Sequence, residues 1–83
     1  MFLDISSAFG KVLRQKRKAA GLTQEQLGLD ANVQRNFVSL IERGVNQPTI
    51  TVVFKLAHAL GCQPSQLFAE VEEMLAQDHQ GAG

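Results

Sequence analysis

Glycine, proline and asparagine residues interrupt this sequence at short intervals, and their spacing restricts the fold more than any other feature. Before the glycine-rich end of the chain they stand at Gly10, Gly21, Gly28, Asn32, Gly44, Pro48, Gly61 and Pro64. Between these positions, apolar residues recur at steps of three, four or seven, which is the spacing of an amphipathic helix. The pattern therefore predicts an all-α fold of five helices without a strand.

Start and stop signals place the five predicted helices along the chain. The first spans about residues 5–20 and ends at Gly21, where a C-cap glycine belongs. Thr23 and Gln26 form a capping box that starts the second helix, and Asn32 ends it about eight residues later. The remaining helices are predicted over residues 34–43, 49–60 and 64–77, and residues 78–83 are predicted to be a flexible tail.

The charges are distributed unevenly along the 83 residues, which are enough for a single domain, predicted over residues 1–77. Residues 1–60 carry all eight basic and four of the eight acidic side chains, a net charge of +4, whereas residues 61–83 carry −4. The basic part of the chain, residues 1–60, can bind a polyanionic partner. The overall net charge of zero predicts that nonspecific affinity for such a partner is modest.

Several classes of protein are excluded by what the sequence lacks. Cys62 is the only cysteine, so an internal disulfide or a cysteine zinc cluster is impossible, and we expect a buried structural thiol. Neither histidine has a second metal-binding residue at the spacing that a metal site needs. The sequence also lacks a Ser/His/Asp set, a pair of catalytic carboxylates and a phosphate-binding glycine loop, so we expect no enzyme, metal or cofactor. Without an export signal or an apolar run of about 18 residues, a soluble, cytoplasmic protein is expected, with no membrane partner.

The second and third predicted helices meet the steric requirements of a helix-turn-helix. Gly28 is small where the two helices approach most closely, Asn32 can adopt the left-handed conformation of the turn, and Val33 can fill it. The positions that must share a core are apolar, namely Leu27, Ala31, Val38 and Ile41. In this motif the second helix lies in the major groove of DNA.

Three motifs resemble the phage repressor and Cro-like helix-turn-helix family, also called the XRE family. They are Thr-Gln-x-x-Leu at residues 23–27, Ile-Glu-Arg-Gly at 41–44 and Leu-Ala-x-Ala-Leu-Gly at 56–61. The resemblance covers about residues 9–68. It implies a compact five-helix, lambda-repressor-like domain that binds operator DNA as a dimer and regulates transcription. Within the family the chain is most similar to restriction-modification controller proteins and to small phage or plasmid repressors.

The outward face of the third helix is predicted to read the bases. The candidate base contacts are Gln34, Arg35, Asn36, Ser39 and Leu40. Arg35 is the first candidate because a guanidinium pairs bidentately with guanine, whereas Gln34 or Asn36 suits adenine. Gln34 departs from the family, which usually has Ser or Thr there. Leu40 replaces a residue that is often polar, so a contact with a thymine methyl is expected instead.

Other polar side chains are predicted to contact the phosphate backbone. Gln24 stands at the start of the second helix, whose N-terminus favours anions. The further candidates are Arg43, Asn46, Gln47, Arg14 and Lys18. Arg17 lies near the apolar stripe and is predicted instead to form a structural ion pair with Glu42. Glu25 is favoured by the helix dipole, and the family resemblance also makes it a candidate activation contact with RNA polymerase sigma factor.

The last helix is predicted to pair two copies of the chain. Its apolar stripe is longer than a small bundle needs, although part of it can be a wall of the same core; the candidates are Phe68, Val71, Met74 and Leu75. Phe54 and Val52 are further candidates. A homodimer would read two half-sites of a palindromic operator about one helical turn apart. The alternative is a protein-interaction module, such as an antitoxin, that keeps the fold without reading DNA.

Overall fold

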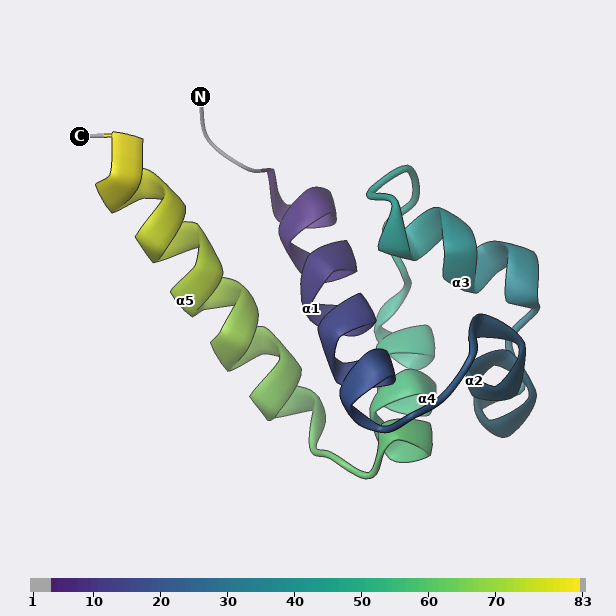
Figure 1. Ribbon diagram of the computed structural model, residues 1–83. Coiled ribbons are helices and arrows are strands. Elements are labelled where there is room, and N and C mark those ends of the chain that lie inside the picture. Colours follow the sequence, from purple (N-terminus) through teal and green to yellow (C-terminus); the bar gives the residue numbers. More distant parts are fainter. Residues whose placement is uncertain (1–3, 83) are drawn as a thin grey trace.

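The structure is a computed structural model that describes the backbone of residues 4–82 and the side chains of residues 4–78. Five helices make up most of this part of the chain (Figure 1): α1 (Ile5–Ala19), α2 (Gln24–Ala31), α3 (Arg35–Glu42), α4 (Ile50–Leu60) and α5 (Pro64–Ala82). No strand occurs among the described residues. The predicted all-α, five-helix fold is confirmed.

Side-chain caps fix where the helices begin. At α2 the Gln26 N–H donates to Thr23 Oγ1 at 3.0 Å and the Thr23 N–H donates to Gln26 Oε1 at 2.9 Å, which confirms the capping box. Thr49 caps α4 through its hydroxyl alone, which accepts from the Val52 N–H at 3.2 Å. Gln34 stands at the N-cap of α3 without a side-chain capping bond, so its carboxamide is not used by the helix.

The turn between α2 and α3 is tight for two local reasons. Asn32 adopts the left-handed conformation, with φ +56°, and the Val33 N–H donates to the Gly28 carbonyl oxygen at 2.8 Å. A Cβ atom at Gly28 would lie 2.5 Å from the Val33 carbonyl oxygen. The expectations for Gly28 and Asn32 are thus confirmed, and the turn holds α3 at a fixed angle to α2.

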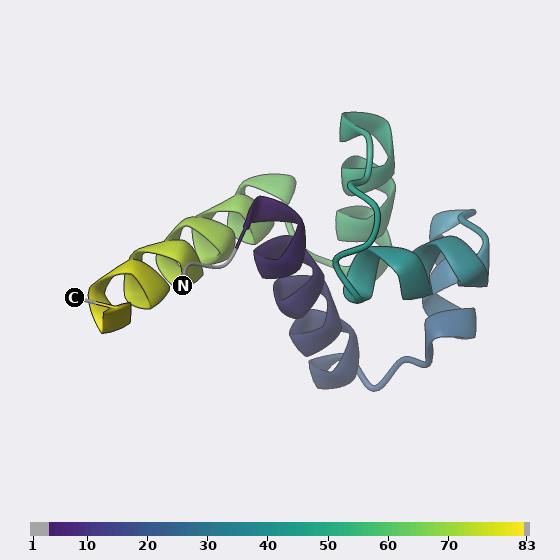
Figure 2. The same ribbon diagram turned by 90° about the horizontal axis from the view of Figure 1, so that it is seen from above.

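One core joins all five helices. Its fully buried large side chains are Leu13, Leu27, Ile41, Leu56, Leu67, Val12 and Val38, so every helix contributes. α1 packs against α5 and α3, and α2 packs against α3 and α4. Figure 2 shows α5 on one flank of α1 and the group α2 to α4 on the other. The sequence prediction that α2 and α3 share an apolar core is confirmed.

α5 is longer than predicted. Its helix runs to Ala82, so the predicted end near residue 77 is wrong, and the segment predicted as a tail over 78–83 is helical as far as the described backbone reaches. No glycine or proline interrupts the segment between Pro64 and Gly81, so nothing local ends the helix earlier. Among the described residues, no helix has both the length and the apolar character needed to cross a membrane.

Candidate nucleic-acid interface

α3 presents one polar face outward. Its buried side is anchored by Val38 and Ile41, neither of which is exposed to solvent. The five candidate base contacts lie on the other side: Gln34, Arg35 and Asn36 are exposed, and Ser39 and Leu40 are half-buried. Because the buried stripe fixes the rotation of the helix, the structure brings the predicted base contacts together on one accessible surface.

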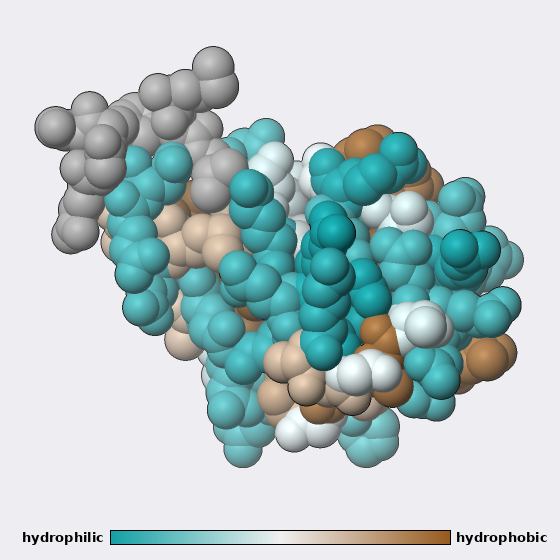
Figure 3. All heavy atoms as spheres, viewed as in Figure 1, coloured by the Kyte–Doolittle hydropathy of each residue, from teal (hydrophilic) through white to brown (hydrophobic). Residues whose placement is uncertain are grey.

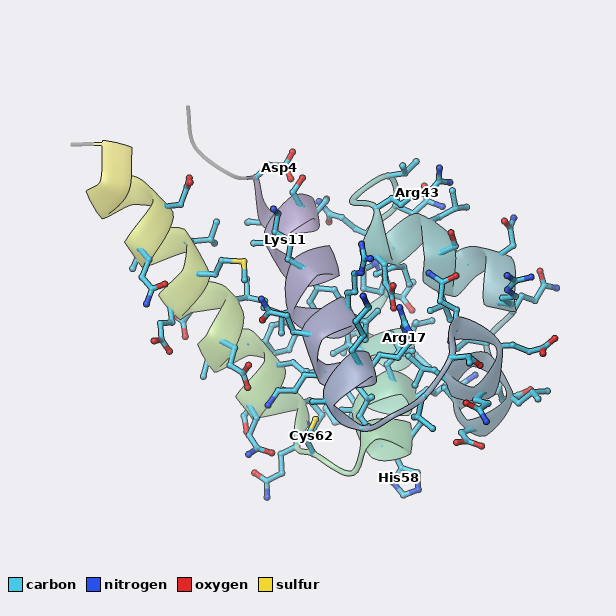
Figure 4. All side chains as sticks on the ribbon, in the orientation of Figure 1. Asp4, Lys11, Arg17, Arg43, His58 and Cys62 are labelled. Atoms are coloured by element: carbon cyan, nitrogen blue, oxygen red, sulfur yellow. The ribbon has the colours of Figure 1, made fainter. Side chains whose placement is uncertain are left out.

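The candidate backbone contacts lie on α1, at the end of α3 and in the loop that follows it, apart from Gln24 on α2. Arg43 is exposed at the C-terminal end of α3 (Figure 4). Asn46 is half-buried and Gln47 exposed in the loop that follows, and Arg14 and Lys18 are exposed on α1. Among the described residues, none of these cations forms an ion pair. Figure 3 shows that the face formed by α1 and α3 is mostly hydrophilic, as a surface for a polyanion should be.

Two hollows flank α3. The first lies at the N-terminus of α2, and both Gln24 and Arg35 border it. The second lies between α3 and α4, where Gln34, Asn36 and Leu40 share it with Lys55. Lys55 is exposed and was not among the sequence candidates, because helical spacing within α4 does not show that this position faces α3.

A buried ion pair holds α3 to α1. Arg17 Nε donates to Glu42 Oε2 at 2.6 Å and Nη2 donates to Oε1 at 3.0 Å, with 11% of the Arg17 and 3% of the Glu42 side chain exposed. The hydrogen bonds to Glu42 raise the pKa of Arg17, so the guanidinium stays charged. Figure 4 shows Arg17 directed into the space between α1 and the motif. The predicted structural pair is confirmed.

Gln24 has a partner that the sequence analysis missed. It is half-buried at the first position of α2, and its Nε2 donates to Glu42 Oε1 at 3.1 Å. The two residues are 18 positions apart, so no local pattern could have shown the contact. Glu25, the candidate activation residue, is the next residue of α2 and is exposed.

The α1–α5 contact carries a second ion pair. Lys16 Nζ lies 2.5 Å from Glu70 Oε2, and the hydrogen bond to Glu70 raises the pKa of Lys16. Cys62 is half-buried and packs against the core, and this burial raises the pKa of its thiol. The expected structural thiol is therefore only partly buried. The sequence analysis did not predict the Lys16–Glu70 pair, whose residues come from α1 and α5.

The dimer candidates differ in how accessible they are. Val71 is buried in the core of its own chain, whereas Met74 and Leu75 are half-buried and Phe68 is 42% exposed. Two apolar side chains of α4 are more exposed than Phe68: Ile50 is 73% and Phe54 is 57% exposed. Val52 is half-buried. A hollow beside Ile50 and Phe68 is also lined by Ile5, Phe9, Pro48 and Val53.

The geometry of α2 and α3 agrees with comparisons to known proteins. Residues 13–67 match the family model described as Helix-turn-helix. The chain belongs to this family of transcriptional regulators. Family membership therefore places it among regulators rather than enzymes.

One relative and two solved structures show what the chain is similar to. Control protein C.BamHI of Bacillus amyloliquefaciens is 34% identical over 65 residues, which cover 77% of this chain and 80% of the relative. The restriction-modification controller protein C.AhdI of Aeromonas hydrophila is 38% identical, with a TM-score of 0.75 over 76% of this chain and 96% of that one. The controller C.Esp1396I, solved as a tetramer with its natural 35 base-pair operator, shares the fold at 24% identity, with a TM-score of 0.81 over 89% of this chain and 97% of that one.

Proposed function

We propose that the protein regulates transcription as a homodimer that binds a palindromic operator, with α3 in the major groove. The observation that carries this proposal is the outward polar face of α3, which is held on a buried apolar stripe by a helix-turn-helix. The charge of +4 on residues 1–60, where this face lies, supports a polyanionic partner. Similarity to the control proteins C.BamHI and C.AhdI supports a role as a restriction-modification controller.

The proposed base contacts divide by chemistry. Arg35 donates two of its guanidinium N–H groups, one to guanine O6 and one to N7, and Gln34 or Asn36 pairs with adenine. Ser39 supplies a hydroxyl that serves as donor or acceptor, and Leu40 contacts a thymine methyl. Their exposure on one face of α3 supports these roles.

The proposed backbone contacts fix the register of the protein on the duplex. Gln24 and the N-terminus of α2 contact one phosphate, and the side chains around α3 contact others: Arg43, Asn46, Gln47, Arg14 and Lys18. Glu25 is exposed beside this surface and is proposed as the contact to RNA polymerase sigma factor. An activating role for the protein rests on that contact.

The proposed dimer surface combines α4 and α5. Ile50, Phe54 and Phe68 expose apolar side chains that a second copy would cover, and Met74 and Leu75 extend the surface along α5. Val71 is not part of this surface because its own core already covers it. Two copies joined here would present two α3 helices to two half-sites.

Selection of bound duplexes from a random pool tests the proposal, because the half-site spacing of the selected sequence reports the dimer geometry. Arg35→Ala should then weaken binding to the selected duplex by about 1–3 kcal/mol and to random duplexes far less. Equal losses on both duplexes would contradict the base-reading role of Arg35. If the wild-type protein retards no duplex even at low salt, the proposed function is wrong.

A further inference from the structure

The Glu42 carboxylate serves two elements of the interface at once. Its Oε1 accepts from Arg17 Nη2 at 3.0 Å and from Gln24 Nε2 at 3.1 Å, while Oε2 accepts from Arg17 Nε. Arg17 Nη1 also donates to the Leu22 carbonyl oxygen, one residue before the α2 N-cap, at 2.8 Å. The last residue of α3 and the first residue of α2 therefore meet at one buried carboxylate.

We infer that Glu42 is a positioning residue that orients the Gln24 carboxamide for its contact with DNA phosphate. This inference rests on the proposed function, in which Gln24 contacts the backbone. A free glutamine side chain loses rotamer entropy when it is immobilised in a complex, and this cost lowers affinity. The hydrogen bond to a carboxylate that is 3% exposed holds Gln24 before DNA arrives, and one N–H of Nε2 remains for the phosphate.

The charge of Glu42 is compatible with a nearby phosphate only because of Arg17. An uncompensated buried carboxylate would repel the phosphate and would itself cost several kcal/mol. Arg17 makes two hydrogen bonds to Glu42, and these raise the pKa of the guanidinium. The pair is consequently neutral as a unit. It presents Gln24 with a hydrogen-bond acceptor without adding net negative charge to the interface.

A double-mutant cycle separates positioning from simple support of the fold. Arg17→Met/Glu42→Met replaces the pair by apolar side chains, which buried pairs often tolerate, and removes the acceptor for Gln24. Arg17→Met/Glu42→Gln is equally uncharged and similar in volume, but it keeps a carbonyl acceptor. Gln24→Ala is combined with each of these and with the wild type. Binding is measured on the duplex that the wild-type protein selects from a random pool, and circular dichroism confirms that each variant is folded.

The positioning role predicts a specific pattern of affinities. Gln24→Ala should weaken wild-type binding about threefold to tenfold, the range expected for one hydrogen bond. It should have nearly the same effect in Arg17→Met/Glu42→Gln, and change affinity less than about twofold in Arg17→Met/Glu42→Met. The same loss in all three backgrounds would overturn the inference while leaving the proposed function intact. Failure of the wild-type protein to bind any duplex would overturn both.

A measurement on the wild-type protein does not depend on whether the variants fold. The side-chain amide protons of Gln24 should exchange with water more slowly than those of Gln15, which is exposed on α1. Nuclear magnetic resonance of the free protein gives both rates. Equal rates would show that Glu42 does not hold Gln24, and the inference would be wrong.

Discussion

Replacement of Gly28 by alanine should destabilise the whole domain, because the structure leaves no space for a Cβ atom at this position. Gly28 is buried within α2, and an added Cβ would lie 2.5 Å from the Val33 carbonyl oxygen and 3.3 Å from the Arg35 backbone nitrogen. Both neighbours are backbone atoms of the turn and of the start of α3. They can move away only if α3 moves relative to α2.

The expected cost follows from two opposing effects. Overpacking costs about 1–3 kcal/mol, and a clash with backbone on a fixed turn belongs at or above the upper end of that range. The higher helix propensity of alanine returns up to about 1 kcal/mol. We expect a net loss of about 2 kcal/mol from a total that is about 4–12 kcal/mol for a chain of 83 residues. The melting temperature should fall by about 8–16 °C.

Thermal unfolding followed by circular dichroism at fixed protein concentration measures this loss. Gly61→Ala is the matched control: Gly61 has φ +75° and open space around its Cβ position, so the cost there is conformational, about 1 kcal/mol. Gly61→Asn should recover part of that cost because asparagine tolerates the left-handed conformation, whereas Gly28→Asn should be as unstable as Gly28→Ala. A melting temperature for Gly28→Ala within about 2 °C of the wild type would refute the steric argument.

Two further predictions concern the dimer surface and the first helix cap. Phe54→Lys should convert the protein to a monomer, which sedimentation experiments would detect. The control is Leu29→Lys, at an apolar position on α2 that is 77% exposed, and this variant should remain a dimer. A dimeric Phe54→Lys would contradict the proposed surface. The Ser7 N–H donates to the Asp4 carboxylate, and this hydrogen bond lowers the pKa of Asp4. Asp4 should therefore stabilise α1 fully at a pH above the ordinary carboxyl pKa of about 3.9. This stabilisation should be lost as the pH falls through the lowered pKa of Asp4. The difference in melting temperature between wild type and Asp4→Ala should therefore shrink in acid, and a constant difference would contradict the cap.

The positions of the helices were predictable because the signals that set them are local. The helix caps and turn glycines act over at most four residues, so reading the chain in short windows is enough to find them. Thr23 and Asn32 both do in the structure what their sequence context predicts. The end of α5 was missed because the sequence from Gln77 onward contains no strong signal to continue or to stop before Gly81.

Periodicity was less informative about what covers an apolar side chain. It placed Phe68 and Val71 on one stripe of α5, but it did not show that Val71 is buried by its own chain while Phe68 stays partly exposed. Nor did it rank Ile50, which is more exposed than either. An amphipathic stripe shows that a helix has a partner surface, and only the placement of the other helices shows whether that surface belongs to the same molecule.

Short stretches of sequence were enough to predict the five helices, the helix-turn-helix and the polar face of α3. The Arg17–Glu42 pair was also predicted, because a cation beside the apolar stripe of α1 needs an anionic partner. Only the packing of the helices brings Gln24 to Glu42, Lys16 to Glu70 and Lys55 to the border of the α3 face. These contacts join residues from different helices. Their existence depends on the angles and distances at which the helices pack, which the shape of the whole core sets and no short stretch of sequence encodes.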